Sequence, residues 1–301
     1  MIDNYMIVDG HTHTYPTDEK ATKILDSFTT LYKMEPTSIG KGTIEEVILN
    51  MERDCIDYTI LANFAPAKIL HANNLWTIEM AKRYKRFVPL ISINPDMEGD
   101  ILAHLKQYIL LGAKGIKIHS SAQDFLPNSD NLQPVYEYCN ETRFPIFFHC
   151  GLTSEVRFNN YSDLDMLLGV IDKYQNIPIV LGHMAEGMVN DVLWLSKAYG
   201  NIFFDTSIAI TGLLCIKRVH DNCWQDDEVV IDIVRKVGAN RIVFGSDYPF
   251  GSPIHDIKRF IQMKLTDEEK GMILGVNAVR VFNIETEQDK NIILNCNIKL
   301  Q

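Results

Sequence analysis

The sequence contains no uninterrupted apolar stretch near the roughly 20 residues that a membrane-spanning helix requires. Its first residues also lack the basic and then apolar order of a secretory signal. The six cysteines show no paired spacing, which favours a reduced protein over a disulfide framework. Positive charge is not in excess: the net charge is -10 and the pI is about 5.4, which disfavours nucleic acid and anionic membrane surfaces as partners. We therefore expect a cytoplasmic protein with no nucleic-acid or membrane partner.

The chain also lacks internal repeats, low-complexity tracts and any Pro/Gly-rich linker that would divide it. A length of 301 residues with 46% hydrophobic content suits one large α/β domain. We predict a single domain over residues 1–301, with a tail, 285–301, of unassigned role. Two connections, 14–42 and 208–225, exceed the usual loop length and are expected to lie on the catalytic face.

Short apolar runs alternate with segments of helical periodicity, a pattern typical of repeated βα units around a parallel sheet. The runs are nearly continuous in hydrophobic residues, as expected for strands that are covered on both faces. We predict strands over 6–13, 58–64, 87–94, 115–119, 145–150, 178–184, 202–207 and 241–247. The predicted helices are 43–49, 73–84, 101–111, 132–140, 163–174, 189–199, 228–237 and 254–263. The predicted fold class is therefore α/β, a (β/α)8 TIM-like barrel.

Histidine and aspartate side chains follow several of these runs, at the strand ends where barrel enzymes assemble their active sites. His11 and His13 lie two residues apart, so on an extended strand they project from the same face. His149 and Asp247 end two further strands. Imidazole nitrogens and a carboxylate oxygen suit a divalent cation such as Zn²⁺. We therefore predict a metal site formed by His11, His13, His149 and Asp247.

A set of short motifs in this order resembles the amidohydrolase superfamily, particularly the amidohydrolase-related branch that contains aminocarboxymuconate-semialdehyde decarboxylase-like proteins. The motifs are Asp9-Gly10-His11-Thr12-His13 and the segments 115–119, 148–151, 181–184, 244–249 and 277–282, so the match spans nearly the whole chain. The resemblance implies a mononuclear or binuclear metal site on a distorted barrel. In it, Asp247 would bind metal or take a proton, and His183 would act on the substrate as an acid-base group or bind a second metal.

Further residues are predicted to contact a small-molecule substrate. Lys117 and His119 share one face of the fourth predicted strand, and the alternative for both is that they only fill the barrel interior. In some branches of the superfamily a carboxylated lysine at this position bridges two metals; here we favour a single metal, with Lys117 or His119 on the substrate. Arg157 could bind a substrate carboxylate or remain a solvated loop residue.

The leading functional expectation is a metal-dependent hydrolase that cleaves an amide, ester or lactone bond through metal-activated water. The alternatives are a non-oxidative decarboxylase of a small aromatic or unsaturated carboxylic acid at the same metal site, and a non-catalytic metal-binding barrel. One zinc ion is the expected cofactor, with manganese or a second metal as alternatives. The resemblance also suggests a homodimer.

Overall fold

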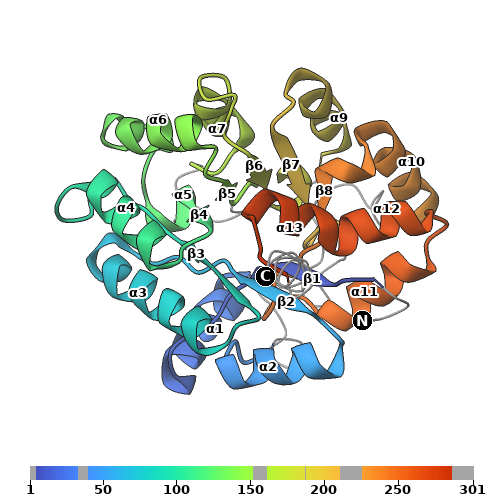
Figure 1. Cartoon of the computed structure of the whole chain (residues 1–301), viewed down its shortest axis with the longest axis horizontal. Helices are drawn as coiled ribbons and strands as arrows, with labels where there is room; N and C mark the ends of the chain where they lie inside the picture. The colour runs from blue at the N-terminus through green and yellow to red at the C-terminus, as the bar shows by residue number, and fades with distance from the viewer. Residues whose placement is uncertain (1–4, 33–39, 152–160, 187, 211–225, 287–301) are drawn as a thin grey trace, which may run out of the picture.

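Eight parallel strands form the centre of the computed structural model, which describes residues 5–32, 40–151, 161–186, 188–210 and 226–286 (Figure 1). They are β1 (Val8–Thr12), β2 (Tyr58–Leu61), β3 (Phe87–Ile91), β4 (Gly115–Ile118), β5 (Ile146–Phe148), β6 (Ile179–Leu181), β7 (Ile202–Asp205) and β8 (Ile242–Val243). They pair in sequence order from β1 to β8. Just beyond β8 the ring is closed onto β1, where Gly10 N donates to Phe244 O at 2.9 Å and Asp247 N donates to His11 O at 2.9 Å. The predicted (β/α)8 barrel is confirmed, with each strand inside its predicted range.

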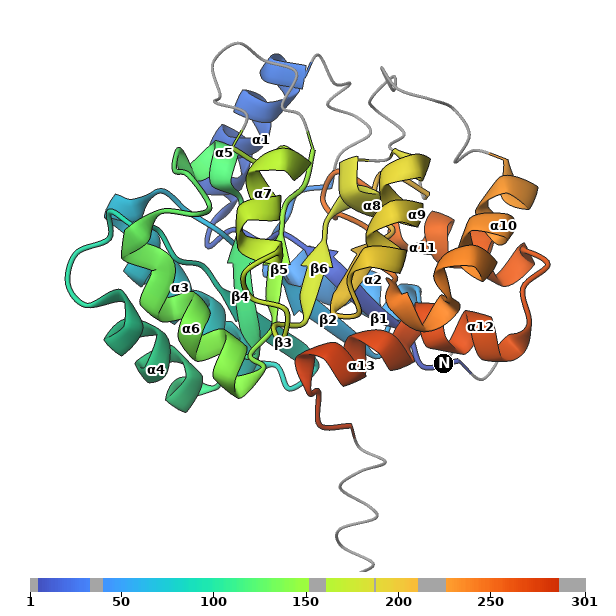
Figure 2. The same ribbon diagram turned by 90° about the horizontal axis from the view of Figure 1, so that it is seen from above.

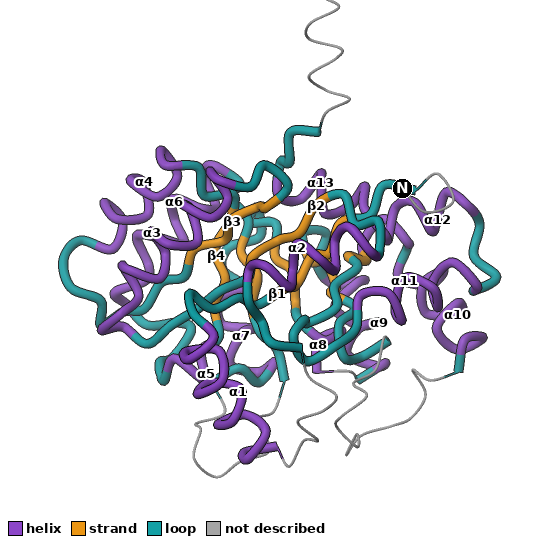
Figure 3. Tube along the Cα trace, turned by 90° about the horizontal axis from the view of Figure 1, so that it is seen from below, coloured by secondary structure: helices purple, strands orange, loops and turns teal. Residues whose placement is uncertain are grey.

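The helices form an outer layer around this ring (Figure 3). Those between the strands and after β8 include α2 (Ile44–Arg53), α3 (Ala67–Arg83), α4 (Ile101–Leu111), α6 (Gln133–Thr142), α7 (Leu164–Ile171), α9 (Val189–Ala198), α10 (Asp227–Val237) and α11 (Pro253–Gln262). Shorter ones are α5 (Ser120–Gln123) and α8 (His183–Glu186). All eight predicted helices are present. The side chain of Thr43 accepts a hydrogen bond from Glu46 N and so caps α2, as its sequence position indicates.

Helix α1 (Asp18–Tyr32) lies within the long connection after β1 and was not predicted. It stands beyond the ends of the strands toward which their arrows point (Figure 2). This location agrees with the expectation that the connection 14–42 lies on the catalytic face. The second long connection, 208–225, falls outside the described residues from 211 onward.

The hydrophobic core has two parts, one on each face of the sheet. The larger cluster lies between the strands and the outer helices, and the smaller one fills the barrel interior with residues such as Val8, Phe147 and Val243. The interior cluster also contains Val281 and Phe282 of α13 (Asn277–Phe282). Figures 2 and 3 show α13 at the end of the barrel opposite α1. Helix α13 thus closes this end of the barrel. It follows α12 (Asp267–Gly271) and a π-helical turn (Met272–Val276), neither of which the periodicity predicted.

A β-bulge interrupts the pairing of β1 with β2. Asp9 pairs with Thr59 and Thr12 with Leu61, so the two residues Gly10 and His11 face a single partner position. No helix among the described residues is long and apolar enough to span a membrane.

Candidate active site

The bulge in β1 turns His11 into the barrel. Val8 belongs to the interior cluster, so regular alternation would turn Asp9 and His11 outward together. The extra residue of the bulge turns the His11 side chain inward instead. The centroid of its ring lies 4.6 Å from that of Phe147, a residue of the interior cluster. His11 is fully buried and His13 is 8% exposed. Their rings lie 5.0 Å apart and both lie within 3.4 Å of Asp247 Oδ1, so the two histidines project from the same side, as their spacing predicts.

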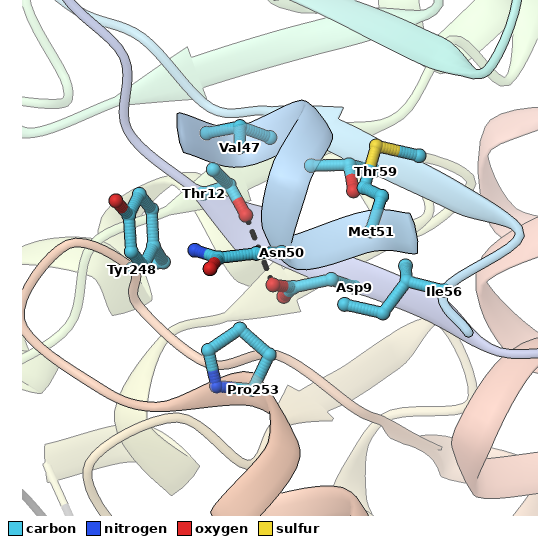
Figure 4. Close-up of a pocket in the computed structure, with 9 residues that line it drawn as sticks. All are labelled: Asp9, Thr12, Val47, Asn50, Met51, Ile56, Thr59, Tyr248 and Pro253. Atoms are coloured by element: carbon cyan, nitrogen blue, oxygen red, sulfur yellow. Dashed lines mark hydrogen bonds between the residues drawn. The ribbon is translucent and has the colours of Figure 1, made fainter. Parts of the chain in front are cut away.

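Asp9 points to the opposite side of β1 and holds the strand against the segment after β8 (Figure 4). Its carboxylate accepts hydrogen bonds from Thr12 Oγ1 at 3.0 Å, Ser246 Oγ at 2.6 Å and Ser246 N at 2.9 Å. Burial raises the pKa of Asp9 to about 6 despite these bonds. Asp9 Oδ1 also accepts from His11 N at 3.3 Å. Because Ser246 precedes Asp247 and Thr12 lies between His11 and His13, Asp9 positions three predicted site residues through their backbone and their neighbours.

The pocket drawn in Figure 4 lies on this outer side. It is lined by Asp9, Thr12, Val47, Asn50, Met51, Ile56, Thr59, Tyr248 and Pro253. None of the predicted metal ligands lies among these residues. We therefore place the active site at the inner side of β1 rather than in this pocket.

His11, His13 and Asp247 converge on one buried point. Asp247 Oδ1 lies 3.4 Å from His11 Nε2 and 3.2 Å from His13 Nε2, and one ligand atom from each of the three lies within 4.8 Å of the others. Two imidazole nitrogens and a carboxylate oxygen form a donor set that fits a divalent cation, and three protein ligands leave positions open for a substrate. The structure therefore brings together three of the four predicted metal ligands.

The electrostatics of this group favour the forms that bind metal. Burial lowers the pKa of His11 well below its ordinary value and also lowers that of His13, which leaves both rings neutral at pH 7. For Asp247, burial alone would raise the pKa of the carboxyl, but attraction to His11, His13 and His183 lowers it below 3.8. Asp247 has a left-handed φ of 58°, a conformation that costs about 1–3 kcal/mol and is common at functional sites.

Lys117 extends from β4 into the same interior and is fully buried. Its Nζ lies 3.0 Å from His11 Nε2 and 3.8 Å from the centre of the Phe147 ring. Burial lowers the pKa of Lys117 to about 8, although Asp247 and Asp205 oppose the shift. At neutral pH the site therefore contains an ammonium group beside the ligand atoms, where an anionic group of a substrate would be attracted.

His149, predicted as a fourth metal ligand, lies with two other histidines. Its ring stacks on that of His119 with centroids 3.6 Å apart, and its Nδ1 lies 3.1 Å from His183 Nε2. His119 in turn accepts a hydrogen bond from Ala122 N through Nδ1, at 3.3 Å. Burial lowers the pKa of His119 and of His149 well below the ordinary value. His149 thus adjoins the group of three without sharing its convergence point.

Two residues at the end of β7, Asp205 and Ser207, complete the site and were missed from the sequence. Asp205 Oδ2 lies 3.1 Å from His11 Nδ1, and Ser207 Oγ lies 3.0 Å from the same atom. Both residues are fully buried, and burial raises the pKa of Asp205. The signal was available, because they end the predicted strand 202–207 as His149 and Asp247 end theirs. Predicted substrate-binding residue Arg157 lies outside the described residues.

Comparison with known proteins identifies the family. The amidohydrolase family model matches residues 8–284. The chain belongs to the amidohydrolase family. The suspected resemblance is thereby confirmed, and the protein is an enzyme of the amidohydrolase superfamily.

Several curated relatives and several solved structures with the same fold are named decarboxylases. The γ-resorcylate decarboxylase of Rhodococcus jostii (strain RHA1) is 25% identical over 130 residues, which cover 40% of this chain and 38% of that protein. The enzyme of the same name from Polaromonas sp. (strain JS666 / ATCC BAA-500) is 25% identical over 123 residues, covering 38% and 37%. The chain thus matches less than two fifths of the length of these relatives.

Among solved structures, 5-carboxyvanillate decarboxylase LigW from Sphingomonas paucimobilis has a TM-score of 0.68 at 14% identity, covering 94% of this chain and 100% of that one. A dihydroxybenzoic acid decarboxylase from Polaromonas sp. JS666, with bound manganese and the inhibitor 2-nitroresorcinol, has a TM-score of 0.68 at 16% identity and covers 95% and 99%. At these identities the likeness establishes the fold alone.

These findings correct the leading functional expectation. Hydrolysis of an amide, ester or lactone was predicted, and the relatives instead carry out decarboxylation, the stated alternative. The error has a chemical cause: the residues that mark the family hold a divalent metal, and a metal site of this composition serves either reaction. A divalent metal site is supported, whereas zinc as its occupant is not confirmed.

Proposed function

We propose that this protein is a metal-dependent decarboxylase of a small hydroxy-substituted aromatic carboxylate. The observation that carries the proposal is that the curated relatives are γ-resorcylate decarboxylases. γ-Resorcylate is 2,6-dihydroxybenzoate, the substrate named for one of the solved structures with the same fold. The buried ammonium of Lys117 beside three metal-type ligands supports this choice, because such a substrate is an anion.

The reaction defines what the site has to do. The bond between the ring carbon and the carboxylate breaks, its electron pair stays on the ring carbon, and a proton takes the place of the departing CO₂. The site must therefore hold an anion, keep its ring carbon accessible to a proton and exclude competing water. A divalent cation held by His11, His13 and Asp247 would supply fixed positive charge for orienting the anionic substrate.

We assign the remaining work to residues that surround this group. Lys117, protonated at neutral pH, attracts the carboxylate or a deprotonated phenol, and His119 forms an aromatic wall with His149 beside it. Asp247 and His183 are the proposed proton carriers, since both lie at the ligand group and neither is held in an ion pair with an arginine or lysine among the described residues. Arg157 stays a predicted contact for the substrate carboxylate.

We propose a single divalent ion, with manganese to be tested first. Two solved decarboxylases with the same fold contain bound manganese. Zinc, expected from the ligand types, is the second ion to test. Two imidazoles and one carboxylate accept either ion, so the ligand set alone does not choose between them.

The test is decarboxylation of 2,6-dihydroxybenzoate and 5-carboxyvanillate by protein stripped of metal and reloaded with manganese or zinc. We expect release of CO₂ and formation of the phenol that lacks the carboxyl group, and no reaction with benzoate, which has no hydroxyl group. Asp247→Asn should abolish turnover, whereas His255→Ala, at an exposed position on α11, should leave it unchanged. Absence of CO₂ release from either hydroxybenzoate with both ions would count against the proposal.

A further inference from the structure

A second group of metal-type atoms lies next to the first, formed by His11, His183 and Asp205 within 4.8 Å of one another. Its centre is filled by the hydroxyl of Ser207. Ser207 Oγ lies 3.0 Å from His11 Nδ1 and 3.1 Å from His183 Nδ1, and it donates a short hydrogen bond to Asp205 Oδ2. An ion bound at about 2 Å from each ligand would have to displace this hydroxyl. The group is therefore a centre of hydrogen bonds rather than a second metal site.

We propose that Asp205 and Ser207 are positioning residues that hold His11 and His183, and through His183 also His149, in the tautomers protonated on Nδ1, so that the lone pairs of His11 and His149 lie on Nε2. The inference rests on the proposed metal site, because it assigns these residues the task of preparing the metal's ligands. It adds two residues, Asp205 at the end of β7 and Ser207 two residues beyond it, to those that the metal-site prediction contained.

The tautomer of His11 follows from counting protons around Asp205. The Oδ2 atom of Asp205 accepts a hydrogen bond from His183 N at 3.2 Å and another from the Ser207 hydroxyl. The Ser207 proton is used in that bond, so Ser207 Oγ can only accept from the two rings. His11 Nδ1 faces these two acceptors and must carry the proton. The lone pair of His11 is then on Nε2, the atom nearest Lys117 and Asp247.

The same accounting extends to the other two histidines. His183 Nδ1 lies 3.2 Å from the carbonyl oxygen of Ser207, which only accepts, so this nitrogen is also protonated. His183 Nε2 therefore accepts, and its neighbour at 3.1 Å, His149 Nδ1, must donate. This leaves the lone pair of His149 on Nε2. A chain of bonds from Ser207 through His183 thus fixes the tautomer of His149, which adjoins the group of three proposed ligands.

The packing restricts Asp205 to this task. Its other carboxylate oxygen, Oδ1, is buried with no hydrogen-bond partner among the described residues. A Cβ atom at Gly245 would overlap Oδ1 and lie 2.8 Å from His11 Cβ. Because residue 245 is a glycine, the segment after β8 packs directly against Oδ1 of Asp205. The Oδ2 atom then faces His11, His183 N and the Ser207 hydroxyl and makes all of the carboxylate's hydrogen bonds within the described part of the chain.

The experiment compares wild type with Asp205→Asn and Ser207→Ala, and uses Thr206→Val as a matched control. Thr206 lies between the two residues, and its hydroxyl accepts a hydrogen bond from Gly245 N at 3.2 Å, so its variant removes a buried hydroxyl from the same segment. Two properties are measured on each protein. The first is Mn²⁺ affinity by calorimetric titration of the metal-free protein, and the second is the ¹⁵N spectrum of the histidine ring nitrogens without metal.

In wild type and in Thr206→Val, we expect Nδ1-protonated rings for His11, His149 and His183, and Mn²⁺ affinities within twofold of each other. In Asp205→Asn, either the amide nitrogen donates to His11 and reverses its tautomer, or a neutral oxygen replaces the carboxylate and the ring becomes a weaker ligand. Both lower Mn²⁺ affinity, by about 10- to 100-fold. Ser207→Ala should leave His11 and His183 exchanging between tautomers, with a smaller loss of affinity.

Unchanged ring spectra and Mn²⁺ affinities within twofold of wild type in both variants would overturn the inference. Failure of the proposed function has a different signature. If wild type binds neither Mn²⁺ nor Zn²⁺, the metal site itself is refuted, and the spectra of the metal-free proteins still decide whether Asp205 and Ser207 set the tautomers. Melting curves of the variants separate both results from a loss of folding.

Discussion

His11 contacts polar groups from three other parts of the barrel. Lys117 comes from β4, Asp205 from β7 and Asp247 from the segment after β8, while His11 itself lies in β1. Its side chain is fully buried, so each polar neighbour replaces a hydrogen bond to water that folding removed. A small displacement of this ring therefore changes the distances to several functional groups at once.

Gly245 offers a direct test of how tightly this arrangement is held. Because an added Cβ would overlap Asp205 Oδ1 and crowd His11, Gly245→Ala should displace both side chains and weaken Mn²⁺ binding by about tenfold or more. Gly200→Ala is the matched control, since a Cβ there meets no atom within 4 Å. Calorimetric titration of both variants measures the effect, and equal affinities would show that the site tolerates the displacement.

Lys117 gives the metal-free protein a defined pH dependence. Burial lowers its pKa to about 8 in the folded state, from 10.5 when exposed, so the unfolded chain binds more protons between these values. The free energy of unfolding should therefore rise with pH from about 8 to 10.5, by on the order of 3 kcal/mol relative to Lys117→Met. Below pH 8 both states are protonated and the difference is constant. Urea titrations across this range test it, and a difference independent of pH would contradict the shifted pKa.

At the scale of elements, the bulge in β1 and the helix α13 determine the two ends of the barrel. The bulge allows Asp9 to face outward and His11 inward, although their spacing in a regular strand would place them together. Helix α13 covers the opposite end with Val281 and Phe282 and takes no part in the site. The candidate active site thus lies at one end of the barrel, and the residues that close the other end contribute to stability, as is typical of this fold.

At the end of the barrel that α13 covers, Phe282 should contribute more to the free energy of unfolding than the exposed Val276. Its ring is fully buried in the interior cluster, so Phe282→Ala should lower the free energy of unfolding by about 3–5 kcal/mol. Val276→Ala, in the preceding turn and 47% exposed, should cost less than about 1 kcal/mol. Denaturant unfolding at neutral pH measures both. Similar losses in the two variants would show that α13 does not seal the barrel.

At the scale of the whole molecule, metal binding and folding are coupled, because the proposed ligands come from strands far apart in the sequence. An ion that binds only the folded state stabilises it, by about 2.7 kcal/mol when its concentration is 100 times the dissociation constant. We expect a chelator to lower the melting temperature and Mn²⁺ to restore it. His13→Ala should lose most of this response, and an equal response in that variant would exclude His13 as a ligand.

The homodimer remains a prediction.

The residues alone were sufficient to predict the barrel, because covered parallel strands require continuous apolar runs and helices require a different period. They also identified His11, His13 and Asp247, since residues at the ends of strands meet at one end of a barrel. Helix α13 was missed because its apolar residues are selected by the barrel interior, which no local pattern describes. The reaction was assigned wrongly because the same ligand types serve hydrolysis and decarboxylation.

The tertiary structure decided what depends on contacts between distant strands. The direction of His11 follows from a bulge that is defined only by the pairing of β1 with β2. The role of Asp205 follows from its 3.1 Å contact with a ring 194 residues away, which a strand-end position suggests but cannot specify. Chemical identity of the side chains is local, whereas ring orientation and protonation are set by neighbours that folding brings together.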